Sequence, residues 1–161
     1  MIDCSLIKLI AGDETYKEFS YQVKKAAEGE YITSMFGWDE NVQRSYHSKA
    51  WQQQKPDIIT YDGKPVGTIA TIESEDCIEV GQFFILPEYQ NKGIGTYLLK
   101  SILEKADQLG MNVTLRFLKN NPAKSLYVRN GFRIVDTSEI LYYMERKVSG
   151  KKLSVNWNDG L

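Results

Sequence analysis

The stretch LPEYQNKGIGTYLLKSIL, residues 86–103, joins an apolar, strand-like run to a long helix through Gly93 and Gly95. Glycine at a helix entrance is needed where φ must be positive or where another group must approach the bare backbone. The first N–H groups of a helix have no intrahelical partner, and together with the helix dipole they attract an anion. Two interpretations follow: a tight turn whose glycines serve geometry alone, or a turn that binds a phosphate group.

Two common phosphate-binding motifs do not match this turn. The dinucleotide-binding fingerprint needs a third glycine at position 98, where the sequence has Leu98. The P-loop needs a glycine, four intervening residues and then Gly-Lys followed by Ser or Thr, and the chain contains no such string. An anion site at this turn would therefore be of another kind.

Hydrophobic periodicity predicts strands and helices on both sides of this stretch. One helix should end at Gly29, before an aromatic and acidic loop at residues 31–40, and the pair Asp62-Gly63 marks a tight hairpin. We expect strands at residues 4–10, 57–61, 65–73, 77–86, 112–117, 132–136 and 140–147, and helices at residues 16–29, 41–51, 94–109 and 122–130. This order predicts an α/β fold (α+β mixed sheet) flanked by about four helices, with the fifth strand parallel to the fourth.

The length and composition set limits on the class of protein. With 161 residues, of which 42% are apolar and 25% charged, the chain is the size of one globular domain. We expect residues 1–148 to form a single domain and residues 149–161 a polar tail. No apolar run approaches the roughly 18 residues needed to cross a bilayer, and no secretory signal opens the chain. We therefore expect a cytoplasmic protein without a membrane partner.

Charge and ligand types narrow the function further. The 20 Lys and Arg residues are balanced by 21 Asp and Glu residues, so no basic excess predicts a nucleic-acid partner. A single histidine, His47, and two distant cysteines, Cys4 and Cys77, do not provide zinc-ligand spacing. We expect no metal ion.

Two segments together resemble the signature of the GNAT superfamily, the acyl-CoA-dependent N-acetyltransferases. The first, FFILPEYQNKGIGTYLL at residues 83–99, contains Gln90, Gly93 and Gly95 at the family's spacing. The second, NPAKSLYVRNGF at residues 121–132, contains the matching residues Asn121, Ala123, Leu126, Tyr127, Gly131 and Phe132. The resemblance covers residues 77–147 most strongly. It implies a GNAT-like fold with a mixed, mostly antiparallel central sheet that splays between its fourth and fifth strands.

The resemblance also implies acetyl-CoA as co-substrate, with its pyrophosphate at the glycine turn. A bulge in the fourth strand would leave backbone groups free to bind the pantetheine arm and to polarise the thioester carbonyl. Asn121, or its neighbour Asn120, would bind the cofactor arm. The expected cofactor-binding residues are Phe83, Phe84, Ile85, Gln90, Asn91, Lys92, Gly93, Ile94, Gly95, Thr96 and Asn121.

Tyr127 and Glu79 are the candidate catalytic residues. In the family, a tyrosine at the position of Tyr127 gives its proton to the departing CoA thiolate, whereas the residue alone could equally pack one face of a helix. Glu79 lies eleven residues before Gln90, the offset of the catalytic glutamate in the histone-acetylating branch. It could take a proton from the amine, or it could be an ordinary exposed strand carboxylate while water takes the proton.

Acceptor recognition is assigned to Trp38, Asp39, Glu40 and Tyr142. An aromatic wall with carboxylates would suit a cationic amine such as a polyamine, an aminoglycoside or a peptide amine, although Asp39 could simply cap the following helix. The predicted function is transfer of an acetyl group to a primary amine of a small molecule or peptide by direct attack. The alternative is a catalytically silent acyl-CoA-binding or sensing module. Edge strands and the stretch LYYM make a homodimer possible.

Overall fold

The computed structural model describes residues 2–149, and within them the chain divides into two compact units. The first unit contains residues 2–71 and 80–97, and the second contains residues 72–79 and 98–149. Each unit is described by itself below. Apart from Ser149, the predicted polar tail lies outside the described residues. Within residues 2–149, no helix combines the length and the apolar character that a membrane span requires.

The first unit is built on an antiparallel meander. Strand β1 (Ile7–Ile10) pairs with β2 (Asp57–Tyr61), β2 pairs with β3 (Lys64–Glu73), and β4 (Cys77–Ile85) follows in the order of the sheet. The β2–β3 turn has positive φ at Asp62 (50°) and Gly63 (79°), so the predicted tight hairpin is confirmed. Ile58 and Ile59 are fully buried in this unit.

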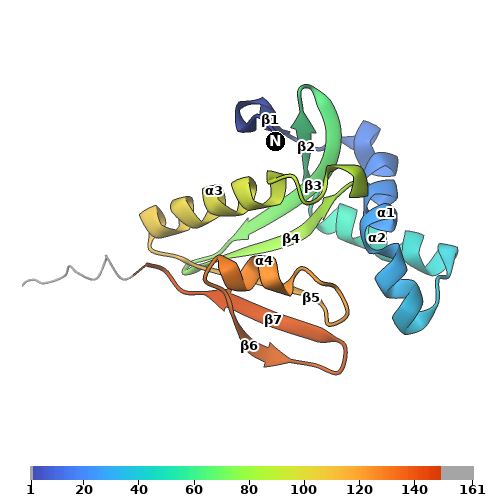
Figure 1. The fold of residues 1–161 in the computed structure, drawn as a ribbon. Coiled ribbons are helices and arrows are strands. Elements are labelled where there is room, and N and C mark those ends of the chain that lie inside the picture. The colour runs from blue at the N-terminus through green and yellow to red at the C-terminus, as the bar shows by residue number, and fades with distance from the viewer. Residues whose placement is uncertain (1, 150–161) are drawn as a thin grey trace, which may run out of the picture. The chain divides into compact units, whose positions relative to one another are not determined.

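Two helices, α1 (Lys17–Phe36) and α2 (Glu40–Gln53), complete the first unit and lie beside each other (Figure 1). The predicted helix end at Gly29 is wrong, because α1 continues for seven residues beyond it, and the predicted loop at residues 31–40 is reduced to Gly37–Asp39. Gly29 lies inside the helix beside the Trp38 ring, where a Cβ would meet Cζ3 at 3.6 Å, an ordinary van der Waals distance. The helix ends at Gly37, whose φ of 77° an L side chain rarely adopts.

His47, the only histidine of the chain, is buried between the two helices of the first unit. Its Nε2 lies 3.0 Å from Oγ of Ser20 on α1, and its ring contacts the rings of Tyr21 and Trp51. Burial, with a smaller contribution from nearby lysines, lowers the pKa of His47 to about 4. His47 is therefore neutral in the folded protein at neutral pH.

This burial predicts a pH-dependent stability. Between pH 4 and pH 6.5 the unfolded chain binds a proton at His47 that the folded protein does not, so the free energy of unfolding falls as the pH falls through this range. The expected loss is on the order of 2 kcal/mol. Urea denaturation at several pH values checks it, with His47→Gln as the variant that should lose this part of the pH dependence. Equal slopes for both proteins would contradict the assignment.

The second unit begins with the parallel pairing of β4 and β5. Cys77–Glu79 of β4 lie in register with Asn112–Thr114 of β5 (Asn112–Leu118), which confirms the predicted parallel pair. Strand β5 then pairs antiparallel with β7 (Leu141–Arg146), and β7 pairs antiparallel with β6 (Arg133–Thr137). The order of strands is β1-β2-β3-β4-β5-β7-β6, so the predicted mixed, mostly antiparallel sheet is confirmed. The splay expected beyond Glu79 concerns the placement of the two units and stays a prediction.

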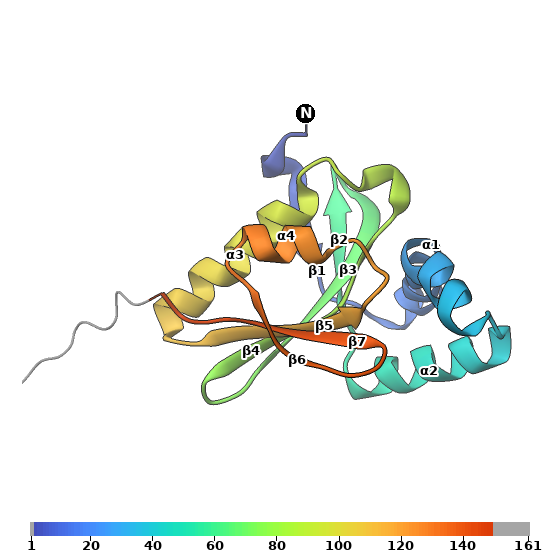
Figure 2. The ribbon, with the colours of Figure 1, turned by 60° about the horizontal axis from the view of Figure 1, so that its bottom comes forward.

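Two further helices connect these strands. Helix α3 (Ile94–Leu109) runs from the glycine turn to β5 and buries Leu98 and Ala106, which its periodicity predicts, together with Leu99 and Leu103. Leu109, at the end of the predicted stripe, is exposed. Helix α4 (Lys124–Arg129) lies next to β5 (Figure 2). The ring of Tyr127 on α4 contacts that of Phe117 on β5.

Candidate active site

The backbone of β4 leaves the regular strand conformation at Gln82, whose φ is 46°. A left-handed residue in a strand is typical of a β-bulge and is unfavourable for a residue other than glycine. Two hydrogen bonds hold it: Oγ1 of Thr68 donates to the Gln82 carbonyl (2.7 Å), and Nε2 of Gln82 donates to the carbonyl of Gln54 (3.0 Å). The irregularity expected in this strand is therefore braced from β3 and from the end of α2.

The three residues after this irregularity, Phe83, Phe84 and Ile85, are half-buried and form the end of β4. Strand β3 approaches them closely through Gly67, because a Cβ built at Gly67 would lie 2.4 Å from the Phe84 carbonyl oxygen. Nε2 of Gln90 donates to the Ile85 carbonyl at 2.8 Å. The side chain of Gln90 thus folds the following turn back onto the strand.

The turn itself has the geometry that its glycines suggested. After a short 3-10 helix at Pro87–Tyr89, φ is positive at Asn91 (61°) and at Gly93 (99°). The Tyr97 N–H donates to the Gly93 carbonyl at 3.0 Å, so the N–H groups just before Tyr97 precede the first helical hydrogen bond and point out of the helix end. Gly95 lies within the first turn of α3. The exposed side chain of Lys92 adds positive charge at the turn.

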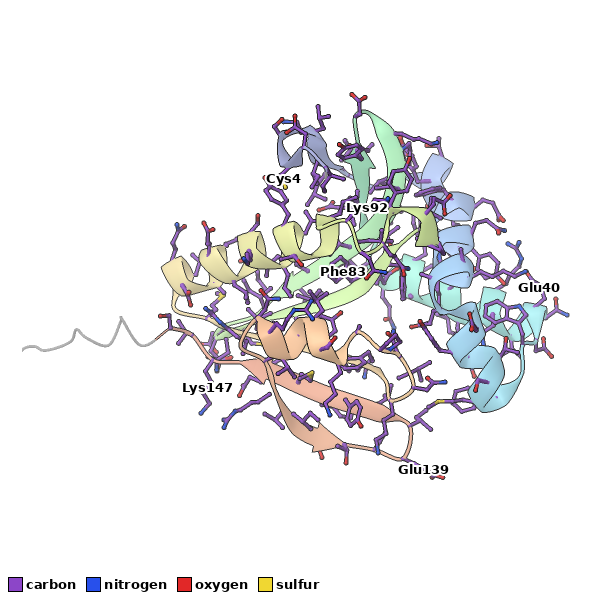
Figure 3. The ribbon with its side chains drawn as sticks, in the orientation of Figure 1. Cys4, Glu40, Phe83, Lys92, Glu139 and Lys147 are labelled. Carbon is purple, nitrogen blue, oxygen red and sulfur yellow. The ribbon has the colours of Figure 1, made fainter. Side chains whose placement is uncertain are left out.

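Trp38, Asp39 and Glu40 lie at the corner between α1 and α2. The Asp39 carboxylate accepts from the Val42 N–H at 3.0 Å and caps α2, which is the structural role that the sequence left open. Figure 3 shows Glu40 well away from Phe83 and Lys92, which are neighbours of the glycine turn. The Asp39 carboxylate is therefore already hydrogen-bonded to a backbone N–H.

The Glu40 carboxylate is also surrounded by donors of the protein itself. It accepts from Nε1 of Trp38 (3.0 Å) and from the Tyr21 hydroxyl (2.8 Å), and it pairs with Lys25 (3.0 Å) and Arg44 (3.1 Å). The hydrogen bond from Trp38, followed by those from Lys25 and Tyr21, lowers the pKa of Glu40 to about 2. A cationic acceptor at this carboxylate would have to compete with two cations that are already bound.

Tyr127 lies in the second unit, with only 8% of its surface exposed. Its ring contacts those of Phe117 (5.2 Å between centroids) and Phe132 (5.7 Å), and its hydroxyl has no hydrogen-bond partner among residues 2–149. Burial raises the pKa of Tyr127 to about 12. The phenol is therefore neutral at pH 7, and its proton has no acceptor within the described part of the chain.

Asn121 and Glu79 also belong to the second unit. Oδ1 of Asn121 accepts from the Ala123 N–H at 2.9 Å and shapes the turn into α4. Glu79 is exposed and lies in register with Thr114, whose Oγ1 is 3.3 Å from Sγ of Cys77. Because side chains alternate along a strand, Glu79 lies on the sheet face opposite to Phe117, against which Tyr127 packs. The two candidate catalytic side chains thus lie on opposite faces.

Tyr142 is paired in register with Phe117, and their ring centroids are 5.7 Å apart. Two contacts of Tyr142 were not predicted: the ammonium groups of Lys119 and Lys124 lie 5.6 Å and 5.0 Å from the centroid of its ring. Both lysines flank Asn121 in the sequence, but nothing in the sequence shows that a strand eighteen residues after Lys124 brings an aromatic ring to them. Gln54, Thr68 and Gln82, which brace β4, were missed for the same reason.

An irregular strand that leads through a glycine with positive φ into the N-terminus of a helix is an arrangement that can bind an anion in an α/β protein. Residues 21–132, more than half of the chain, match the model of the acetyltransferase (GNAT) family. The chain belongs to this family.

Individual relatives agree with this assignment. An uncharacterized N-acetyltransferase of Methanocaldococcus jannaschii is 31% identical over 84 residues, which cover 47% of this chain and 37% of that protein. The matched region thus spans less than half the length of this curated relative.

Solved structures show the same fold. The PaiA N-acetyltransferase of Thermoplasma acidophilum, in complex with coenzyme A, has a TM-score of 0.71 at 20% identity, covering 88% of this chain and 98% of that chain. The ribosomal-protein-S18-alanine N-acetyltransferase of Escherichia coli has a TM-score of 0.67 at 18% identity, covering 96% of this chain and 99% of that chain. At these identities the likeness concerns the fold alone.

Proposed function

We propose that this protein transfers an acetyl group from acetyl-CoA to a primary amine of a small molecule or peptide by direct attack. The observation that carries the proposal is the turn after β4, where Asn91 and Gly93 have positive φ and the first N–H groups of α3 are open. Membership of the acetyltransferase (GNAT) family supports acetyl-CoA as the anion that binds there.

The turn, the end of β4 and Asn121 would each contact a different part of acetyl-CoA. The N–H groups of residues 91–96 would donate to the pyrophosphate, with Lys92 adding positive charge. Phe83, Phe84 and Ile85 would offer backbone groups to the pantetheine arm, and a backbone N–H there would polarise the thioester carbonyl. Asn121 in the second unit would contact the arm through its side-chain nitrogen, because its oxygen already accepts from Ala123.

The reaction needs two proton transfers. The amine nitrogen attacks the thioester carbonyl carbon, the new C–N bond forms and the C–S bond breaks. Because Glu79 and Tyr127 lie on opposite faces of the sheet, the amine gives its proton to Glu79 through water, and the CoA thiolate takes a proton from Tyr127. Holding both reactants together supplies much of the remaining acceleration.

Binding of acetyl-CoA is tested by thermal unfolding. A ligand that binds only the folded protein stabilises it, by about 2.7 kcal/mol at a concentration one hundred times the dissociation constant. We expect the melting temperature to rise with acetyl-CoA concentration. It should rise less with adenosine-containing fragments of CoA that lack the pyrophosphate. A melting temperature that does not change at millimolar acetyl-CoA would rule out the proposed co-substrate.

The role of Glu79 is tested by Glu79→Gln. Without the carboxylate, turnover should depend on amine that is already deprotonated, so kcat/KM at pH 7 should fall about a hundredfold and recover as the pH rises. The control is Glu75→Gln, which removes another exposed carboxylate, in the β3–β4 turn. This variant should keep the wild-type pH–rate profile. An unchanged profile in Glu79→Gln would assign the proton to water.

A further inference from the structure

Two ammonium groups converge on one aromatic ring in the second unit. Lys119 follows the end of β5, Lys124 begins α4, and their Nζ atoms lie 5.6 Å and 5.0 Å from the ring centroid of Tyr142 on β7. The Lys119 N–H also donates to the Ile140 carbonyl at 2.9 Å, which fixes the backbone of Lys119 beside the start of β7. Three separate segments thus bring two positive charges to the same small area.

Neither lysine is neutralised by a carboxylate. Among residues 2–149, no Asp or Glu forms an ion pair with Lys119 or Lys124, although six such pairs occur elsewhere. Glu139 lies in the β6–β7 turn, at the edge of the molecule in Figure 3. Two cations around one ring repel each other, and an anionic group bound beside them would remove this repulsion and form charge-assisted hydrogen bonds.

The position of these charges connects them to the proposed chemistry. The Tyr142 ring contacts Phe117 at 5.7 Å, and Phe117 contacts Tyr127, the proposed acid, at 5.2 Å. The Phe117 ring therefore contacts both Tyr142 and the residue that would protonate the leaving thiolate. The lysine pair, Tyr142 and the proposed acid thus belong to one cluster of side chains within the second unit.

The carboxylates that the sequence offered to a cationic acceptor are engaged elsewhere. Asp39 caps α2, and Glu40 is bound by Lys25 and Arg44. Among the predicted acceptor residues, the charges that are not already paired are therefore positive. They are the two lysines beside Tyr142.

We propose that Lys119 and Lys124 bind an anionic group of the acyl acceptor, a carboxylate or a phosphate, while the Tyr142 ring packs against its carbon skeleton. The acceptor is then an amino acid or a phosphorylated amine rather than a polycation. This inference rests on the proposed acetyl transfer and names the class of its acceptor.

The test compares acceptors that differ only in the anionic group. Amino acids are paired with their carboxamides, and phosphoethanolamine is paired with ethanolamine, in assays of CoA release with the full chain. We expect the anionic member of at least one pair to have a kcat/KM about tenfold higher or more. In Lys119→Met/Lys124→Met this preference should disappear through a higher KM, while kcat and the KM for acetyl-CoA stay unchanged.

The matched control is Lys147→Met, which removes a lysine just beyond the other end of β7 (Figure 3) and should keep the preference. A second measurement does not need turnover: calorimetric binding of N-acetyl amino acids and N-acetyl carboxamides to the CoA-bound protein should show the same preference. Preferential binding of the anionic products without turnover would support the anion site and refute acetyl transfer.

Three results would overturn the inference. Equal turnover of anionic and neutral acceptors would leave acetyl transfer intact and remove the anion site. A double variant whose KM rises for acetyl-CoA alone would assign the lysines to a phosphate of CoA. Absence of any preference in both turnover and product binding would likewise refute the site, whatever acetyl-CoA does in thermal unfolding.

Discussion

Tyr127→Phe is expected to lower kcat by about a hundredfold to a thousandfold, the range for loss of a general acid. The variant keeps the ring and its contacts with Phe117 and Phe132 and removes only the hydroxyl. Since the CoA thiolate would then leave without a proton, the loss should appear in kcat, while the KM for acetyl-CoA changes little. Stopped-flow and steady-state assays of CoA release measure both quantities.

Removal of the Tyr127 hydroxyl should change catalysis without changing the stability of the fold. It has no partner within residues 2–149, so its removal does not leave a buried group unpaired, and the melting temperature should not fall. Tyr143→Phe, on the same β7 strand as Tyr142, is the control and should keep full activity. Full turnover in Tyr127→Phe would show that another group or water protonates the thiolate.

Gly93→Ala is expected to raise the dissociation constant of acetyl-CoA by at least about tenfold. The φ of 99° at Gly93 is unfavourable for an L residue, with a cost of about 1–2 kcal/mol for left-handed backbone. The turn can relieve this strain only by moving the N–H groups that would hold the pyrophosphate. Isothermal titration with acetyl-CoA measures the change.

The control for this variant lies at the other end of the same helix. Gly110, just after α3, also has positive φ (71°), and nothing lies within 4 Å of a Cβ built there. Gly110→Ala should therefore lower the melting temperature to a similar degree while leaving acetyl-CoA affinity unchanged. Equal affinities in Gly93→Ala and Gly110→Ala would show that the geometry of the turn does not determine binding.

The sequence predicted most of the fold because the decisive signals are local. The Asp62-Gly63 hairpin, the apolar stripe of α3 and the glycine at the entrance of α3 each report on neighbouring residues. The prediction failed at Gly29, where α1 continues through a glycine that is buried beside the Trp38 ring. Tertiary packing overrides helix propensity at such a position.

The candidate site divides in the same way. The glycine turn and Tyr127 lie in continuous motifs, so they could be identified from the residues and from the resemblance to a family. The donors around Glu40 come from two helices, and the lysines at Tyr142 come from segments that meet only after β5 and β7 pair. The acidic residues beside Trp38 suggested a cationic acceptor, because a sequence shows which charges exist but not which ones are already paired.

The central claim, acetyl transfer to an amine, is tested most directly by mass spectrometry of the acceptor. The protein is incubated with acetyl-CoA labelled in the acetyl group and with the acceptor pairs described above, polyamines, aminoglycosides and peptides. We predict an acceptor that gains one labelled acetyl group on nitrogen at a rate that depends on Tyr127. If no acceptor gains the label although acetyl-CoA stabilises the protein, the chain binds acyl-CoA without transferring its acetyl group, and the account of catalysis is wrong.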